Sequence, residues 1–191
     1  MGTSILIISK NEKDDTRMGE TQQISIRAIS QADTHSVYEY ALKNRMRLAA
    51  WEPLREESYF SHAGAEGRVF NMLSAMQSGN AMHFVILHSQ AVIGFINYTN
   101  IIRGPFMACH LGFSIDQDFE GKGYMFSALE QTLEYLKNEL YLHRVMANYM
   151  PHNIKSERVL ARLHFKKEGY AEAYLKIHGQ WQDHVLTSLI F

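Results

Sequence analysis

Two glycines at the start of a long amphipathic segment are the strongest sign of chemistry in this sequence. Gly121 and Gly123 flank Lys122, and they let the backbone turn so that successive N–H groups converge on one point. The segment that follows, to about Glu139, has apolar residues at helical spacing. The positive end of that helix would add to the attraction for an anion. The pattern predicts a pyrophosphate site, to which the Lys122 side chain can add a charge.

The glycines alone are equally compatible with a turn that only starts a helix. Two other nucleotide-binding loops do not fit the residues. A dinucleotide-binding loop requires a third glycine where Phe126 stands. A P-loop requires Ser or Thr after the lysine, and Gly123 stands there.

The elements that must position this loop follow from hydrophobic periodicity. Their order is a strand, two helices, three strands, a helix, a strand, a helix and two strands. This order predicts an α/β (α+β) fold with a mixed, mostly antiparallel, twisted sheet of six to seven strands and helices on both faces. The expected strands are 24–28, 84–87, 92–96, 109–115, 144–147, 170–177 and 181–189, and the expected helices are 30–44, 68–78, 124–139 and 153–163.

The length of 191 residues fits one domain, which we place at residues 23–191. Residues 1–22 are expected to form a flexible N-terminal extension, with an extra edge strand as the alternative. The single cysteine, Cys109, excludes an internal disulfide framework and fits a reducing compartment, so we expect a cytoplasmic protein.

The formal net charge of −1 gives no support for a protein that binds DNA or a membrane surface. No run approaches the roughly 20 apolar residues of a membrane span. The histidines show no metal-ligand spacing, so no metal is expected. We expect either a monomer or a homodimer.

The glycine loop resembles that of the acetyltransferases of the GNAT superfamily. Their Gln/Arg-x-x-Gly-x-Gly/Ala loop corresponds to residues 118–123, with Asp118 in place of Gln or Arg. A second family feature is an Asn followed about a dozen residues later by Leu-Gly-Phe. Here Asn153 precedes Leu163-His164-Phe165, with His164 in place of the glycine.

Longer stretches are similar to the RimJ/RimL branch of that superfamily, and most of all to its RimJ enzymes. The resemblance covers roughly residues 23–191. The stretches that carry it are Trp51-Glu52-Pro53, Gly121–Phe126, Met146–Asn153, Gly179-Gln180-Trp181 and Asp183–Thr187.

The resemblance implies a GNAT fold with splayed central strands and acetyl-CoA as cosubstrate. It implies direct attack by an amine in a ternary complex, the amine being the N-terminal alanine α-amine of a ribosomal protein. Asn153 would contact the pantetheine arm, although an Asn there also caps a helix well. The residues expected to bind the cofactor are Phe113, Ser114, Ile115, Gly121, Lys122, Gly123, Tyr124, Met125, Asn148 and Asn153.

The reaction requires an amine to lose its proton and a thiolate to leave. A free α-amino group has a pKa near 8, so the base needs only modest strength. An oxyanion needs a donor, most simply a backbone N–H near Phe113–Ile115. The positions where many GNAT enzymes carry a Glu base and a Tyr acid fall on Asn148 and Leu160, and neither residue can do that work.

Ser156 lies one helical turn before Leu160, and RimL-type enzymes have a serine there, so it is our candidate acid. A surface or capping serine is the alternative. Glu52 is our candidate base, either directly or through a water, and Trp51 and Glu52 are expected to bind the acceptor. Glu52 is otherwise a helix-start carboxylate or a surface charge. His110 and His152 are further candidates for the base.

Two other functions stay open. The same fold and cofactor can serve a small-molecule amine, such as an amino sugar, a polyamine or a drug. A non-catalytic CoA-binding module is the alternative outside the enzymes. A closed acceptor pocket would favour a small molecule, and an open groove would favour a peptide.

Overall fold

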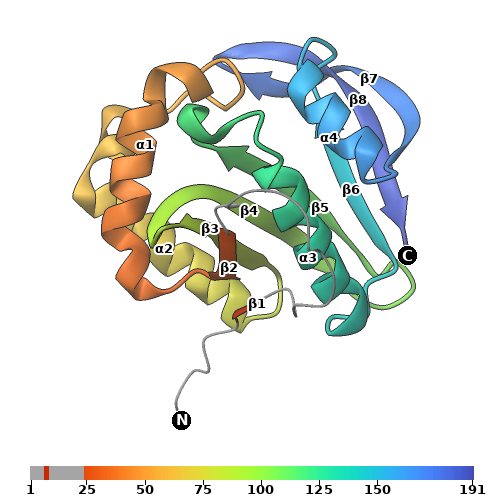
Figure 1. Cartoon of the computed structure of the whole chain (residues 1–191). Coiled ribbons are helices and arrows are strands. Elements are labelled where there is room, and N and C mark those ends of the chain that lie inside the picture. The colour runs from red at the N-terminus through yellow and green to blue at the C-terminus, as the bar shows by residue number, and fades with distance from the viewer. Residues whose placement is uncertain (1–6, 9–23) are drawn as a thin grey trace.

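The computed structural model describes residues 7–8 and 24–191. One sheet runs through it in the order β1-β2-β3-β4-β5-β6-β8-β7 (Figure 1). The expectation of a mostly antiparallel sheet of six to seven strands is confirmed by the seven strands β2 to β8. The strands are β1 (Ile7–Ile8), β2 (Ile24–Ala28), β3 (Met82–His88), β4 (Ala91–Ile102), β5 (Ala108–Ile115), β6 (Arg144–Tyr149), β7 (Lys166–Ile177) and β8 (Gln180–Ile190).

The flexible extension expected at residues 1–22 lies outside the described residues, apart from Ile7–Ile8. These two residues pair with Arg27 and Ile26 of β2 and add an eighth strand at the edge of the sheet.

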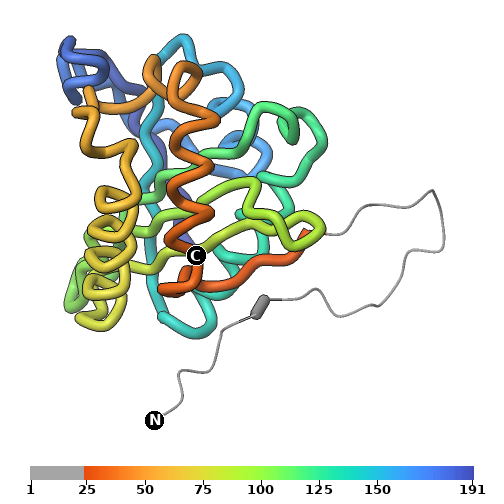
Figure 2. The backbone as a smooth tube through the Cα atoms, turned by 90° about the vertical axis from the view of Figure 1, so that its left-hand side faces the viewer, coloured from red at the N-terminus to blue at the C-terminus, as the bar shows by residue number. Residues whose placement is uncertain are grey.

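Helices cover both faces of the sheet, as expected (Figures 1 and 2). Helices α1 (Thr34–Leu48) and α2 (His62–Gln77) lie side by side on one face, and α3 (Tyr124–Asn138) and α4 (Ile154–Arg162) lie on the other. Three short 3-10 turns accompany them: η1 (Gln31–Asp33), η2 (Glu57–Phe60) and η3 (Gln117–Phe119). Of the helices in the described ranges, none has the length and apolar character to cross a membrane.

The central strand β3 shows why the sheet needs cover on both sides. Its alternate residues Phe84 and Ile86 belong to the core beneath α3, whereas Val85 and Leu87 belong to the core beneath α1 and α2. All four are buried. A strand buried on both faces reads as a continuous apolar run, which is the pattern of this segment.

Several element boundaries differ from expectation. Helix α2 begins at His62, six residues before the start that the sequence predicts. The sequence pattern misses these first turns because Gly64 and Gly67 interrupt their apolar spacing. Ser61 caps it by accepting a hydrogen bond from the Gly64 N–H. Helix α1 continues four residues beyond Asn44, to Leu48. Strands β4 and β7 are also longer than predicted.

The sheet opens between β5 and β6. These strands form the parallel pair, and they are in register only at Ala108–Arg144, Cys109–Val145 and His110–Met146. Beyond this point β5 remains paired with β4 as far as Ile115, while β6 remains paired with β8 as far as Tyr149. In this part of the described chain, the edges of β5 and β6 that face each other therefore have no strand partner.

Candidate active site

The glycine loop adopts the conformation that its sequence predicts. Gly121 has φ +73° and Gly123 has φ +80°, a region that favours glycine. Gly123 is the N-cap of α3, so the first N–H groups of a well-formed helix have no intrahelical acceptors. A Cβ atom at either glycine would meet no heavy atom within 4 Å, so the loop borders open space. These features fit a pyrophosphate held by backbone donors.

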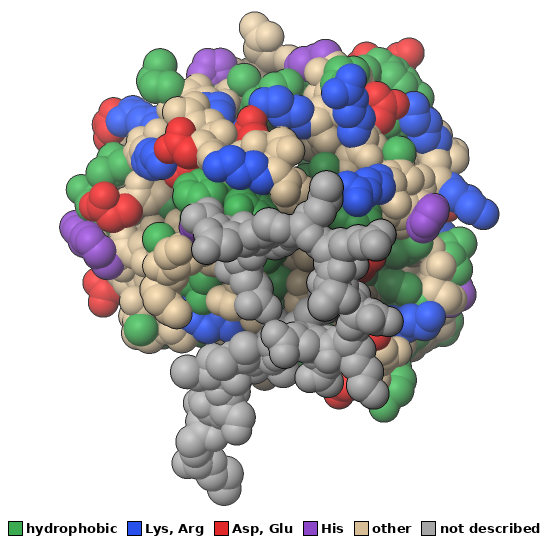
Figure 3. All heavy atoms as spheres, in the orientation of Figure 1, with side chains coloured by type: hydrophobic (Ala, Val, Ile, Leu, Met, Phe, Trp, Pro, Cys, Tyr) green, Lys and Arg blue, Asp and Glu red, His purple; other side chains and the backbone are tan. Residues whose placement is uncertain are grey.

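Basic side chains surround this loop. Figure 3 shows Lys and Arg gathered across the upper part of the face, interleaved with acidic side chains, where Figure 1 places the loop and α4. Lys43 pairs with Asp116 and Asp118 at 2.7 and 2.6 Å. Asp118, which replaces the family's Gln or Arg, thus helps to fasten the loop to α1.

Glu120 ties the loop to both helical layers. It pairs with Arg47 of α1 at 2.9 Å and with Lys155 of α4 at 2.5 Å. The Lys122 ammonium lies over the Phe119 ring at 5.1 Å from its centroid. The loop is therefore positioned by charges from two directions, while its backbone donors remain available to a ligand.

A cavity of about 180 Å³ occupies the opening between β5 and β6. Seven of the predicted site residues line it, although they come from four separate segments of the chain. These seven are Trp51, Glu52, Phe113, Ser114, Asn148, Asn153 and Ser156.

Asn153 and Ser156 lie together at the start of α4. The Asn153 Oδ1 accepts the Ser156 N–H at 3.1 Å, so Asn153 is the N-cap of the helix. Both residues line the cavity, so the capping role of Asn153 is compatible with the predicted contact to the cofactor. The cap leaves the Ser156 hydroxyl free to turn toward the cavity, because only its backbone N–H is used.

The remaining predicted cofactor residues lie outside this cavity. Gly121 to Met125 form the loop and the first turn of α3, and the Met125 side chain is buried in the core, so only its backbone can reach a ligand. The Ile115 carbonyl accepts a hydrogen bond from Arg47 at 2.6 Å, at the end of β5.

The other candidates from the sequence occupy different places. The Cys109 thiol is buried, and burial raises its pKa to about 12, which suits a core residue better than a nucleophile. The His110 Nδ1 atom is shielded from solvent, and within residues 24–191 it has no hydrogen-bond partner. His152 packs near Trp51 at 5.4 Å between ring centroids. In the described ranges, no three His, Cys, Asp or Glu side chains gather in a way that could hold a metal ion.

His184 lines the cavity and was missed by the sequence reasoning. It is 4% exposed, and its Nδ1 lies 3.0 Å from the carbonyl of Gln182. A carbonyl only accepts hydrogen bonds, so Nδ1 carries a proton and Nε2 is the nitrogen that can take one up. The Asp183–Thr187 stretch gave a signal of family resemblance, but nothing local showed that β8 carries His184 to the opening.

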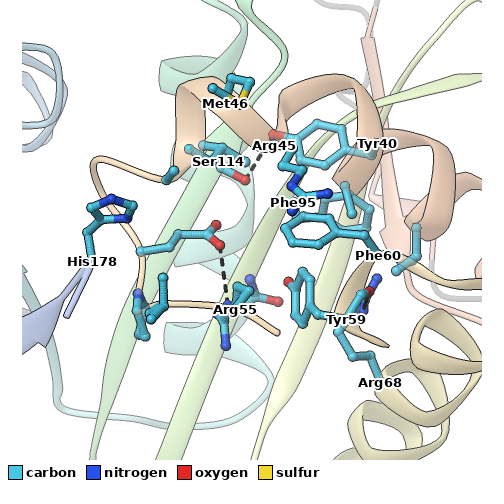
Figure 4. Close-up of a pocket in the computed structure, with 18 of the residues that line it drawn as sticks. Tyr40, Arg45, Met46, Arg55, Tyr59, Phe60, Arg68, Phe95, Ser114 and His178 are labelled. Atoms are coloured by element: carbon cyan, nitrogen blue, oxygen red, sulfur yellow. Dashed lines mark hydrogen bonds and ion pairs between the residues drawn. The ribbon is translucent and has the colours of Figure 1, made fainter. Parts of the chain in front are cut away.

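A second cavity, of about 310 Å³, lies between α1, the segment after it, α2 and the sheet (Figure 4). Leu48, Glu52 and Ser114 line both cavities, so the two adjoin at these residues. At this junction the Tyr40 hydroxyl donates to Ser114 Oγ at 2.9 Å. The His178 N–H donates to the Glu52 carbonyl at 2.9 Å and so joins the β7–β8 turn to the segment after α1.

Comparison with known proteins gives consistent results. The family model of the acetyltransferase (GNAT) domain matches residues 23–166. The chain is 43% identical, over 171 residues, to the ribosomal protein uS5-alanine N-acetyltransferase of Escherichia coli (strain K12), covering 88% of each chain.

Solved structures agree with this result. The ribosomal-protein-S5-alanine acetyltransferase from Vibrio fischeri has a TM-score of 0.85 and 39% identity, covering 90% of this chain and 95% of that one. RimJ from Mycobacterium smegmatis, in complex with CoA-disulfide, shares the fold with a TM-score of 0.83 at 24% identity, covering 87% of this chain and 81% of that one.

Proposed function

Because the chain belongs to the GNAT acetyltransferase family and is an acetyl-CoA-dependent N-acetyltransferase, we propose that its acceptor is a protein N-terminus. The reacting group is the α-amine of an N-terminal alanine, and the physiological acceptor is a ribosomal protein. The Escherichia coli relative is named for this reaction on uS5. The observation that carries the proposal is the junction of the two cavities, since it connects a site for an acceptor chain with the opening in the sheet.

The glycine loop and the opening in the sheet would bind different parts of acetyl-CoA. Backbone N–H groups of Gly121 to Met125 would hold the pyrophosphate. The unpaired edge of β5 at Phe113–Ile115 would receive the pantetheine arm, and Asn153 and Asn148 border the same path. Acetyl-CoA supplies the activated acetyl thioester when it is bound.

Two protons must move during the reaction, and we assign one to Glu52 at the junction and the other to Ser156 in the opening. A C–N bond forms as the amine attacks, and the C–S bond breaks. The amine proton passes to the Glu52 carboxylate, directly or through a water, because Glu52 borders both cavities. The Ser156 hydroxyl, on the α4 side of the opening, gives a proton to the departing sulfur. A backbone N–H of β5 near Ser114 stabilises the oxyanion.

A thiol-release assay with acetyl-CoA tests the proposal. One set of acceptors is peptides that begin with Ala, Ser or Met, and the other is spermidine and amino sugars. The proposal expects turnover on the Ala-led peptide, with the acetyl group at the α-amine by mass spectrometry. Turnover only on the small amines would assign the site to a small molecule, and cofactor binding without any turnover would indicate a non-catalytic module.

A further inference from the structure

The larger cavity carries an excess of positive charge. Three arginines line it, Arg45, Arg55 and Arg68, and Glu52 is the carboxylate among its lining residues. Figure 4 shows the three arginines around Tyr59 and Phe60. Much of the remaining lining is apolar, including Val37, Met72 and Phe95. Charges in such surroundings interact more strongly than they do in water.

Two of the three arginines already face a carboxylate. Arg45 forms a two-pronged pair with Glu57, with distances of 2.9 and 2.5 Å. The Arg55 Nε atom lies 3.6 Å from a Glu52 carboxylate oxygen. These contacts compensate two positive charges within the protein itself.

Arg68 differs from both. Its guanidinium packs over the Tyr59 ring at 3.8 Å, and Nη1 donates to the Tyr59 carbonyl. Its Nη2 atom is shielded from solvent and has no hydrogen-bond partner within residues 24–191. Burial lowers the pKa of the guanidinium, but an arginine keeps its charge in proteins.

A half-buried guanidinium with an unpaired N–H lowers the stability of the folded protein unless a ligand compensates its charge. A buried donor without an acceptor destabilises a protein, and a charged donor does so more than a neutral one. A carboxylate matches the planar guanidinium and would balance its charge.

The position of Arg68 shows which part of an acceptor would meet it. Glu52 and Ser114 stand where the two cavities adjoin, whereas Arg68 lines only the larger one. The reacting amine must reach the junction, so Arg68 meets a later part of the chain. Each residue of an extended peptide advances about 3.3 Å, so a side chain a few residues from the amine can span this cavity.

We propose that Arg68 binds a carboxylate side chain at the second, third or fourth residue of the acceptor peptide. This proposal rests on the proposed function and narrows its substrate class to N-termini with an early Asp or Glu. Glu52 would attract the positively charged N-terminus of such a peptide, and Arg68 would attract its acidic side chain. The two charges would therefore also set the orientation of the peptide in the cavity.

Matched peptides test the proposal. Each begins with Ala and carries Glu or Gln at position 2, 3 or 4, and kcat/KM is measured for the wild type, Arg68→Gln and Arg45→Gln. For the wild type we expect a preference for Glu of about 10- to 100-fold at one position, as for a charged hydrogen bond. Arg68→Gln should abolish the preference, and Arg45→Gln should keep it, because Glu57 already neutralises Arg45.

Equal rates on all Glu and Gln peptides with the wild type would overturn the Arg68 proposal while leaving peptide acetylation intact. A preference that survives Arg68→Gln would also overturn it. No turnover on any peptide, together with turnover on small amines, would instead refute the proposed function. If Arg68→Gln does not fold, a wild-type co-crystal with the preferred peptide decides: its carboxylate must lie within hydrogen-bond distance of Arg68, and a carboxylate bound elsewhere contradicts the proposal.

Discussion

Asn153 and Ser156 combine an observed structural role, the cap of α4, with the chemical roles that we propose for them. The cap hydrogen bond between them begins α4 and holds both side chains at the opening in the sheet. Because the cap uses the Asn153 side chain and only the backbone of Ser156, the serine hydroxyl remains available for proton transfer.

Removing that hydroxyl should slow the chemical step. We expect Ser156→Ala to lower kcat by roughly 10- to 100-fold with a smaller change in KM, which is the signature of an interaction made mainly in the transition state. Ser127→Ala, on α3 and outside both cavities, is the matched control. An unaltered kcat in Ser156→Ala would remove the serine from the mechanism.

The proposed role of Glu52 as the base can be tested through the pH dependence of kcat. Glu52→Gln keeps the shape of the side chain and removes its charge, so kcat should fall roughly 100-fold at pH 7. The loss should shrink at pH 9, because an α-amine with a pKa near 8 is then mostly neutral without help. Steady-state kinetics across this range are the measurement. The same measurement is made on His184→Gln. A larger loss of kcat in His184→Gln than in Glu52→Gln would indicate that the His184 imidazole is the base.

At the scale of elements, the glycine loop and α2 both depend on glycine, but for different reasons. Gly121 needs a positive φ, whereas Gly64 needs the absence of a Cβ. A Cβ atom at Gly64 would lie 2.1 Å from the Ser58 carbonyl oxygen, because η2 packs directly against the first turn of α2.

A valine at the loop should damage cofactor binding. Gly121→Val forces a branched residue into φ +73° and fills the open space beside the loop, so the Kd for acetyl-CoA should rise at least about tenfold. Gly104→Val is the control, since Gly104 has φ +70° but lies in the turn before β5, at the far end of that strand from the site. Titration calorimetry showing the same Kd for wild type and Gly121→Val would refute the phosphate site.

Two glycines of α2 should respond in opposite directions to the same change. Gly64→Ala should lower the free energy of unfolding by about 1–3 kcal/mol, because the backbone of η2 must move. Gly67→Ala meets nothing within 4 Å and should raise it by up to about 1 kcal/mol through helix propensity. Urea unfolding of the two variants measures both effects. Equal shifts would show that η2 does not pack against Gly64.

At the scale of the whole molecule, an ion pair connects strand β2 to the segment that leads into the helical layer. Arg27 of β2 donates to both carboxylate oxygens of Asp33, at 2.7 and 2.6 Å, just before α1. Burial by itself raises the pKa of Asp33, but hydrogen bonds from Arg27 and Ser30 together outweigh it, and the net pKa is lowered. Asp33 is 3% exposed, so solvent screens this pair little.

The lowered pKa fixes the sign of a pH effect. A depressed carboxyl pKa contributes stability above its unfolded value, near 4, and that stability is lost as the pH falls through the folded value. Asp33→Asn should therefore cost roughly 2–3 kcal/mol at pH 7, and the difference from wild type should shrink below about pH 4. Urea unfolding at several pH values is the measurement. Glu57→Gln, in an exposed pair, should behave like wild type, and a pH-independent deficit in Asp33→Asn would contradict the assignment.

Local patterns in the sequence were sufficient to predict the helices and strands. They were also sufficient to predict those parts of the candidate site that lie within one element. The alternation of apolar residues predicted the order of strands and helices, and the two glycines predicted a tight loop that begins a helix, because these features depend on neighbours in the chain. Boundaries failed where local signals conflicted, as at Gly64, whose role depends on a contact with η2.

The sequence by itself determined the family. It also determined the turn at Gly121–Gly123 and the proximity of Asn153 and Ser156, since each of these is a short motif whose geometry is set within one or two turns. Only the tertiary structure decided where β5 and β6 part, that His184 reaches the opening, and that Arg68 lines the larger cavity. Those features arise from strand register and from helices packed across the sheet, and such long-range contacts leave no periodic signal in the chain.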